Sequence, residues 1–166
     1  MRLVEIKYYA ISLKLLFHQM YIIWISDEID GVLLNTESKI VSFNTEHSLR
    51  QHLTNMGLEF TGDTTVLDIG YIQQWLVNPV ANVNYNTFLN SWNLFTDISS
   101  SLGIQFLGDK KEVVRNSVYD KLFDSAGPFI EENPDMIFNN RQIAVLAEVM
   151  KNGISLLFDH LALAAN

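Results

Sequence analysis

Acidic residues gather in two parts of this 166-residue sequence, and their carboxylates are its most suggestive chemistry. The first group is Asp27, Glu28 and Asp30, in the turn-rich stretch Ser26–Gly31. The second group lies within residues 109–135, and its candidates for partner binding are Asp120, Asp124, Glu131, Glu132 and Asp135. Carboxylates can hold a hard cation, transfer protons or attract a basic partner. A solvated surface is the ordinary role of such groups, so each use is weighed against it.

Calcium binding by the first group can be judged from the spacing of its ligands. Five residues match positions 1, 3, 5, 6 and 12 of a calcium loop: Ser26, Glu28, Asp30, Gly31 and Glu37. The first position normally holds aspartate, and the flanking segments are typical of strands, whereas an EF-hand requires two helices. We therefore predict an acidic surface turn and no metal site.

The rest of the sequence lacks the patterns that catalysis requires. His47 and His52 are five residues apart on a predicted helix, so their rings point in different directions, whereas a zinc pair needs a spacing of four. Ser99–Ser101 does not lie in a Gly-x-Ser-x-Gly elbow, and Gly103–Gly108 matches no phosphate-binding loop. The sequence therefore predicts a protein that is not an enzyme and that uses no cofactor.

Composition and charge restrict the class of protein. Hydrophobic residues make up 48% of the chain, which suits one folded domain over residues 1–166. The sequence contains no cysteine, which excludes disulfides, thiolate metal sites and cysteine nucleophiles. The formal net charge of −8 argues against direct binding of nucleic acid, because phosphate contacts need clustered Lys and Arg. The same charge suits a basic protein partner, although it also serves solubility.

The N-terminal segment raises the question of a membrane span or a signal peptide. Tyr8–Ser26 is rich in apolar residues, but Lys14, His18 and Gln19 interrupt it, and a spanning helix needs about 20 apolar residues. Glu5 lies where a signal peptide would be basic. We therefore expect a cytoplasmic protein without a membrane partner. Residues 1–19 could form an extension, an added strand or a helix, and the sequence leaves these alternatives open.

Strand patterns occupy residues 20–43 and mainly helical patterns residues 44–166, so the predicted fold class is α+β. The predicted strands form a small antiparallel N-terminal sheet: Met20–Ile25, Val32–Leu34 and Lys39–Phe43. The predicted helices are residues 45–56, a helix from Asp68 to Asn78, residues 88–102 ending at Gly103, residues 111–124, a helix from Asn139 or Asn140 to Gly153, and a buried terminal helix over Ile154–Ala164. We expect four to six helices packed around residues 88–102.

The predicted helix over residues 88–102 carries the clearest periodicity in the sequence. Phe88, Trp92 and Phe95 recur at helical spacing. An aromatic stripe of this kind belongs to a core far more often than to a cofactor site. We therefore predict that this helix is central and that Trp92 is mostly buried.

Four segments share a pattern with a known family: Trp24–Glu28, Lys39–Leu49, Phe88–Asp97 and Val118–Phe123. Together they resemble the immunity proteins of bacterial contact-dependent growth inhibition systems. The resemblance extends over residues 20–125, and it includes neither residues 1–19 nor the sequence after Phe123. Its matching residues are mostly packing residues, so it carries over no catalytic residue.

The resemblance implies a cytoplasmic inhibitor that binds and neutralises the C-terminal domain of a cognate toxin, often a basic nuclease. In this interpretation the two acidic groups occupy the substrate groove of the toxin. One alternative is a regulatory or adaptor domain with another protein partner, and another is a small hydrolase. Gene order separates the first two hypotheses, because an immunity gene directly follows its toxin gene.

Overall fold

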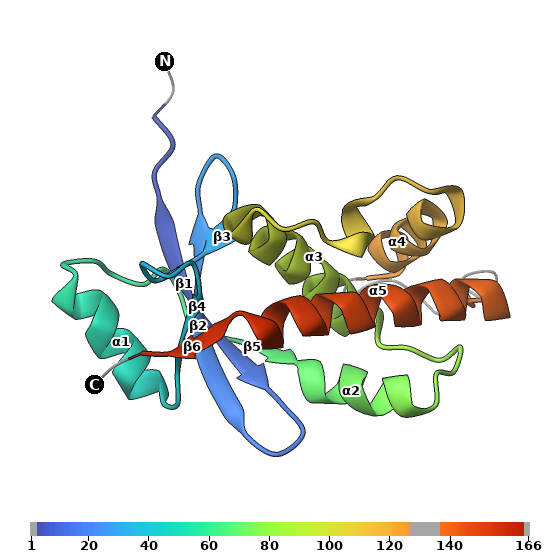
Figure 1. Cartoon of the computed structure of the whole chain (residues 1–166), viewed down its shortest axis with the longest axis horizontal. Coiled ribbons are helices and arrows are strands. Elements are labelled where there is room, and N and C mark those ends of the chain that lie inside the picture. The colour runs from blue at the N-terminus through green and yellow to red at the C-terminus, as the bar shows by residue number, and fades with distance from the viewer. Residues whose placement is uncertain (1–2, 127–136, 165–166) are drawn as a thin grey trace.

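A mixed β-sheet lies between one helix on one side and four helices on the other (Figure 1). The computed structural model describes residues 3–126 and 137–164. The strands are β1 (Lys7–Lys14), β2 (Gln19–Ser26), β3 (Gly31–Val32), β4 (Ile40–Phe43), β5 (Thr65–Asp68) and β6 (Leu161–Leu163). The helices are α1 (Glu46–Asn55), α2 (Ile69–Val77), α3 (Tyr85–Leu102), α4 (Val113–Ser125) and α5 (Asn140–Asp159), with the short 3-10 helix η1 (Leu107–Asp109) before α4. The predicted α+β class is confirmed.

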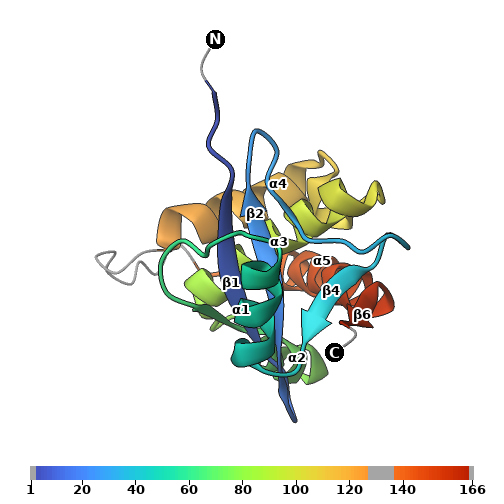
Figure 2. The ribbon, with the colours of Figure 1, turned by 90° about the vertical axis from the view of Figure 1, so that its left-hand side faces the viewer.

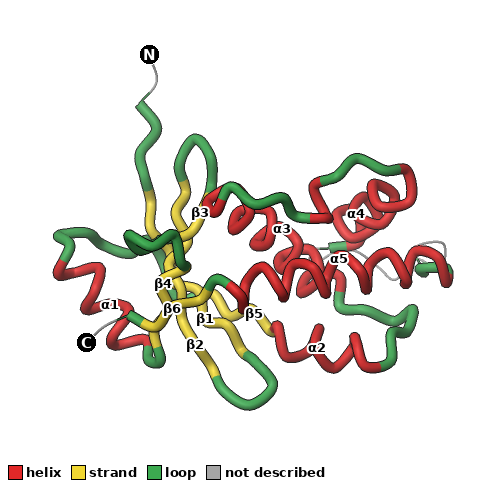
Figure 3. The backbone as a smooth tube through the Cα atoms, in the orientation of Figure 1, coloured by secondary structure: helices red, strands yellow, loops and turns green. Residues whose placement is uncertain are grey.

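The sheet has the strand order β5-β1-β2-β4-β6, and β3 also pairs with β2. Figure 3 shows the strands in yellow, between α1 and the other helices in red. β1 and β2 form an antiparallel hairpin, which settles the open question of residues 1–19 in favour of an added strand over Lys7–Lys14. β3 and β4 run antiparallel to β2, as predicted. The sheet is larger than predicted and is not wholly antiparallel, because β5 and β6 pair in parallel with β1 and β4.

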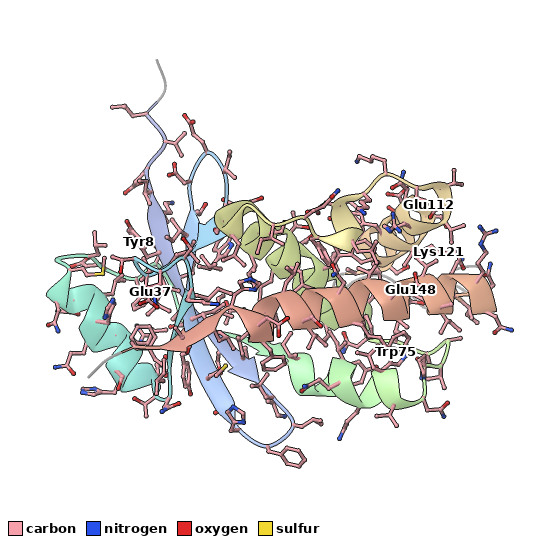
Figure 4. All side chains as sticks on the ribbon, viewed as in Figure 1. Tyr8, Glu37, Trp75, Glu112, Lys121 and Glu148 are labelled. Atoms are coloured by element: carbon pink, nitrogen blue, oxygen red, sulfur yellow. The ribbon has the colours of Figure 1, made fainter. Side chains whose placement is uncertain are left out.

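Two apolar clusters form, one on each face of the sheet. Neighbouring side chains of a strand point to opposite faces, so Ala10 clusters with Leu49 of α1, whereas Leu13 belongs to the larger cluster with the other helices. Figure 2 shows α1 lying across the near face of the sheet. Figure 4 shows Tyr8 on β1 and Trp75 on α2, which pack against the smaller and the larger cluster respectively. The sheet is therefore covered on both faces.

Local hydrogen bonds begin and end several helices where the sequence indicated. The Asp68 carboxylate accepts a hydrogen bond from the Tyr71 backbone N–H at 2.9 Å, which caps α2. Asn139 and Gln142 form a reciprocal capping box at the start of α5. Gly103 follows α3 in the left-handed conformation, with φ at 67°, which glycine adopts without steric cost.

α3 is the central helix, and Trp92 is buried, both as predicted. The relative exposures of Phe88, Trp92 and Phe95 are 0%, 2% and 0%. The Phe88 ring meets Trp75 edge to face at 4.9 Å between centroids, and Phe95 meets Phe106 at 5.7 Å. α3 thus packs against α2, α4, α5 and the sheet through a continuous aromatic core.

α5 corrects the predicted helix end at Gly153. The helix runs without a break from Asn140 to Asp159, and Gly153 is buried within it. A Cβ atom at this position would come within 2.0 Å of the Phe95 ring. The glycine therefore allows α5 to approach α3 closely, and it does not terminate the helix.

The predicted terminal helix over Ile154–Ala164 is wrong in its last part. Leu161–Leu163 forms β6, and the Ile40 backbone N–H donates to the His160 carbonyl at 2.7 Å. The Ser42 hydroxyl donates to the carbonyl of Ala162, 120 residues away, at 3.0 Å. Because the pairing partner is so distant in sequence, the local apolar pattern does not distinguish this strand from a helix.

Candidate functional site

The solvent-facing side of α3 is polar, opposite its aromatic core face. Asn90, Asn93 and Asp97 follow one another at spacings of three and four, which places them on one side of the helix. Asn90 and Asn93 are exposed, and Asp97 is half-buried. A hollow lies on each side of this ridge, one toward the sheet and one toward α4, and Asn93 lines both. We call the ridge and its two hollows the α3 face.

Asp97 is held against the sheet by a hydrogen bond from β2. The Trp24 indole Nε1 donates to Asp97 Oδ2 at 2.8 Å. Burial raises the pKa of the Asp97 carboxyl above its usual value, the hydrogen bond from Trp24 opposes this rise, and the charges of Asp30 and Asp109 add to it. Asp30 and Asp109 therefore lie within electrostatic reach of Asp97.

The sheet-side hollow has a volume of about 310 Å³ and lies between α3 and strands β1, β2 and β5. Its apolar lining residues are Tyr9, Ile11, Trp24, Leu67 and Leu94. The rings of Tyr9 and Trp24 are 5.1 Å apart between centroids and are inclined at 48°. Asp97 and Asn93 lie on its polar side. Apolar and aromatic walls with a few placed polar groups are the usual form of a binding pocket.

The α4-side hollow is more polar and has a volume of about 450 Å³. The Tyr119 hydroxyl donates to Asn93 Oδ1 at 2.8 Å and so joins α4 to the ridge. Burial raises the pKa of the Tyr119 hydroxyl above its usual value, and the charges of Asp120 and Asp97 add to this rise. Arg115 lines the same hollow, which therefore contains groups of both charges.

The serine run of α3 connects neighbouring segments to the helix. The Thr96 hydroxyl donates to Asp109 Oδ1 at 2.6 Å, which holds η1 on α3. The single proton of the Ser99 hydroxyl is shared between the Thr96 carbonyl at 2.8 Å and Asp109 Oδ2 at 3.0 Å. The Ser101 hydroxyl accepts a hydrogen bond from the Val32 backbone N–H at 2.9 Å, which holds β3. A nucleophilic serine is normally activated by a base such as histidine. The hydroxyls of Thr96, Ser99 and Ser101 instead form hydrogen bonds that connect segments of the fold.

One predicted acid lies on the α3 face and one lies near it. Asp30 is half-buried in the β2–β3 loop and raises the pKa of Asp97, and Asp120 lines the α4-side hollow. The other predicted acids that the structure describes are exposed: Asp27, Glu28 and Asp124. The remaining three predicted acids, Glu131, Glu132 and Asp135, lie outside the described residues.

Two acids of the α3 face were not among the predicted site residues. Asp97 lies on the helix that its aromatic stripe marked as core, and the spacing of Asn90, Asn93 and Asp97 is the signal that reveals a polar side. Asp109 gives no comparable local signal, because its place depends on Thr96, which is 13 residues away. The predicted site residues therefore include Asp30 and Asp120 but neither Asp97 nor Asp109.

Groups that could hold a metal ion were also sought on the surface and in the core. Within residues 3–126 and 137–164, no three His, Asp or Glu side chains are arranged as metal ligands. His52 packs on the Phe43 ring at 5.1 Å between centroids, and His160 Nδ1 lies 2.8 Å from the carbonyl oxygen of Leu156. These two histidines have structural contacts. In the same ranges, no helix is both long and apolar enough to cross a bilayer.

Comparison with known proteins supports the fold and identifies no family. No protein-family model matches the chain, and no curated protein matches it. The crystal structure of the SatS C-terminal domain in complex with bromine is similar, with a TM-score of 0.56 and 12% sequence identity. The similarity covers 95% of this chain and 94% of that chain. At this identity the similarity shows a shared α+β fold alone.

Proposed function

We propose that this chain is a non-catalytic inhibitor of the immunity type, which binds and neutralises a basic toxin domain such as a nuclease. The observation that carries the proposal is that Asp97, Asp109 and Asp120 lie on the α3 face and that Asp30 is near enough for its charge to act on Asp97. Asp30, Asp97, Asp109 and Asp120 come from the β2–β3 loop, α3, η1 and α4. The resemblance to contact-dependent growth inhibition immunity proteins supports the same function, because such proteins act by binding.

The charge of the chain favours association with a basic partner. The net charge is −8. The α3 face carries a small part of it, because Lys111 and Arg115 line the α4-side hollow together with Asp109 and Asp120, whereas Asp97 lines the sheet-side hollow. Complementary fields accelerate encounter and disfavour partners of like charge. A toxin that acts on nucleic acid needs a basic groove for phosphates, and this groove is the surface that carboxylates would occupy.

Asp97 and Asp109 are held in place before any partner arrives. Asp97 accepts a hydrogen bond from Trp24, and Asp109 accepts hydrogen bonds from Thr96 and Ser99. Fixed carboxylates lose little conformational entropy when they form short, charge-assisted bonds with arginine. A few such residues can supply most of the binding energy of an interface that buries about 800 Å² on each partner.

Inhibition in this proposal is steric and electrostatic. The α3 face covers the substrate groove of the toxin, and its carboxylates take the positions of nucleic-acid phosphates. The cytoplasmic location implied by the resemblance belongs to the same proposal. A regulatory or adaptor role could use the same surface, and it differs in that the partner would keep its activity on binding.

The direct test uses the protein encoded by the gene immediately upstream. Its C-terminal domain is purified, its nuclease or other toxic activity is measured, and this chain is added in increasing amounts. We expect complete inhibition at a one-to-one ratio. A variant with Asp30→Lys and Asp120→Lys should inhibit at least about tenfold more weakly, because like charges across an interface repel.

The matched control reverses two acids that lie off the α3 face. Glu59 follows α1 and Glu148 lies on α5, and both are exposed. A variant with Glu59→Lys and Glu148→Lys changes the net charge equally and should inhibit as the natural chain does. Binding without loss of toxin activity would support the adaptor role, and equal inhibition by both variants would remove the α3 face from the proposal.

A further inference from the structure

The sheet-side hollow combines features that suit a single cationic side chain. Its walls include the Tyr9 and Trp24 rings, and Asp97 stands on its polar side. We propose that this hollow is an arginine-binding pocket, in which a guanidinium group lies against the two rings and donates hydrogen bonds to Asp97. The chemistry of the pocket stands by itself, whereas its use by a toxin rests on the proposed function.

The two carboxylate oxygens of Asp97 have different surroundings. Oδ2 accepts the hydrogen bond from Trp24 Nε1 at 2.8 Å. Within the described residues, Oδ1 receives no protein hydrogen bond and is not enclosed, so it is available to a ligand. Because Trp24 both forms the wall and holds the carboxylate, the aromatic surface and the negative charge have a fixed relative position.

The charges around the pocket select a cation. Asp30 and Asp109 are close enough to raise the pKa of Asp97, so the local field is negative. An anionic ligand would be repelled by this field. A neutral apolar ligand would bury Asp97 further without compensating its charge, which is unfavourable. A cation instead gains a partner in Asp97 and an electron-rich ring face in Tyr9 and Trp24.

The shape of the pocket favours arginine over lysine. A guanidinium is planar, stacks on aromatic rings and carries five donors in one plane, whereas an ammonium is compact and more strongly hydrated. Asn90 also lines the pocket, and its side-chain amide can accept a further hydrogen bond from a planar group with several donors. A volume of about 310 Å³ is at the small end of ligand pockets, which suits one long side chain.

The test uses the full chain and small probes, without any toxin. N-acetyl-arginine amide is titrated while the indole N–H resonance of Trp24 is followed by NMR, and Trp24→Phe assigns that resonance among the three tryptophans. We expect saturable shifts with a dissociation constant of about 1 mM, as for a single side chain. N-acetyl-citrulline amide has nearly the same shape without the charge and should bind about tenfold more weakly or worse.

Two variants and one further probe make the result decisive. Asp97→Asn keeps an oxygen that can accept the Trp24 hydrogen bond, so it should fold normally and reduce arginine binding to the citrulline level. Asp124→Asn removes an exposed acid outside the hollow and should bind arginine as the natural chain does. Equal binding of citrulline, equal binding of N-acetyl-lysine amide, unaltered binding by Asp97→Asn, or no shift at all would each overturn the arginine pocket.

Together with the inhibition assay on the upstream protein, this titration separates the pocket from the proposed function. If arginine binds as described and the upstream protein is not inhibited, the proposed function fails and the pocket remains. If the toxin is inhibited but arginine does not bind, the pocket fails and the inhibitor remains. If Asp97→Asn loses both activities, this arginine pocket is part of the inhibitory surface.

Discussion

The Trp24 indole donates a 2.8 Å hydrogen bond to Asp97, 73 residues further along the chain. This bond joins β2 to α3 at the point where the aromatic wall of the sheet-side hollow meets the acidic ridge. It places a half-buried carboxylate where folding alone does not need one, because a neutral amide could accept the same hydrogen bond. The effect of the Asp97 charge on the free energy of unfolding can therefore be measured.

Asp97 should make stability depend on pH. Burial raises the pKa of Asp97 in the folded protein above the value near 3.8 that an unfolded chain has, so the folded state holds the proton more tightly. The stabilising contribution of protonated Asp97 is full below the unfolded value and is lost as the pH rises through the folded value. At neutral pH the Asp97→Asn protein should therefore be more stable than the natural chain.

Urea unfolding at pH 7 and near pH 4 measures this effect. The advantage of Asp97→Asn should shrink as the pH falls, because natural Asp97 then becomes neutral as well. Asp124→Asn is the control, since Asp124 is exposed and should show no such trend. A loss of stability in Asp97→Asn at neutral pH would mean that the carboxylate stabilises the fold.

Two aromatic residues of opposite exposure, one in α3 and one outside it, test the central role of this helix. Trp92 has a relative exposure of 2%, whereas Phe17, at the β1–β2 turn, has 95%. Trp92→Ala should lower the free energy of unfolding by about 3–5 kcal/mol, because it leaves a large cavity. Phe17→Ala should change it by less than about 0.5 kcal/mol. Chemical denaturation of both proteins checks the prediction, and similar stabilities would contradict the central role of α3.

The elements that sequence analysis placed well depend on local interactions. Asp68 caps α2 through a residue three positions away, and Gly103 ends α3 by its own backbone conformation. The elements it missed depend on distant partners. Gly153 is adapted to Phe95 on another helix, and β6 is a strand because β4 lies beside it. No local pattern contains these contacts, so a helix end and a terminal helix were predicted instead.

The candidate site likewise has features that local sequence reveals and features that depend on distant contacts. The exposed acids Asp27 and Asp120 were evident from composition and helical spacing, but their position relative to α3 is a tertiary property. Asp97 was hidden by the stronger aromatic signal of its own helix. Its functional interest arises from Trp24 on β2, a contact that only the folded chain reveals.

Gly153→Ala should reverse the usual effect of this substitution in a helix. Alanine normally stabilises a helix interior by about 0.5–1 kcal/mol relative to glycine. Here the added Cβ would come within 2.0 Å of the Phe95 ring, so we expect a loss of about 1–3 kcal/mol. A double-mutant cycle with Phe95→Leu identifies the cause. Additive effects of the two substitutions would show that Phe95 is not the obstacle.

Calcium and zinc should have no effect on this protein. Ser26 replaces the expected aspartate of a calcium loop, and the described residues hold no group of three metal-ligating side chains. A metal that binds only the folded state must raise its stability. Melting temperatures measured with either ion at stoichiometric and tenfold excess should equal that in chelator. A reproducible rise with one of the ions would point to a site that includes residues beyond the described ranges.

Binding of the proposed basic partner should be sensitive to salt, chiefly in the association rate. Exposed carboxylates steer encounter through a field whose Debye length is about 8 Å at physiological ionic strength. Reversing two acids on α4, with Asp120→Lys and Asp124→Lys, should lower the association rate about tenfold at low salt and leave the fold intact.

Reversing Asp27 and Glu28 to lysine tests the β2–β3 loop in the same way, and the Glu59→Lys and Glu148→Lys protein, with reversals off the α3 face, provides the control. The association rates are measured by stopped-flow or surface-based kinetics against the upstream toxin domain at about 50 mM and about 500 mM NaCl. The rates of the variants should become similar at high salt, because screening removes the long-range part of the field. Rates that do not change with salt or with any reversal would replace electrostatic docking with an apolar interface, for which the aromatic wall of Tyr9 and Trp24 is one candidate surface.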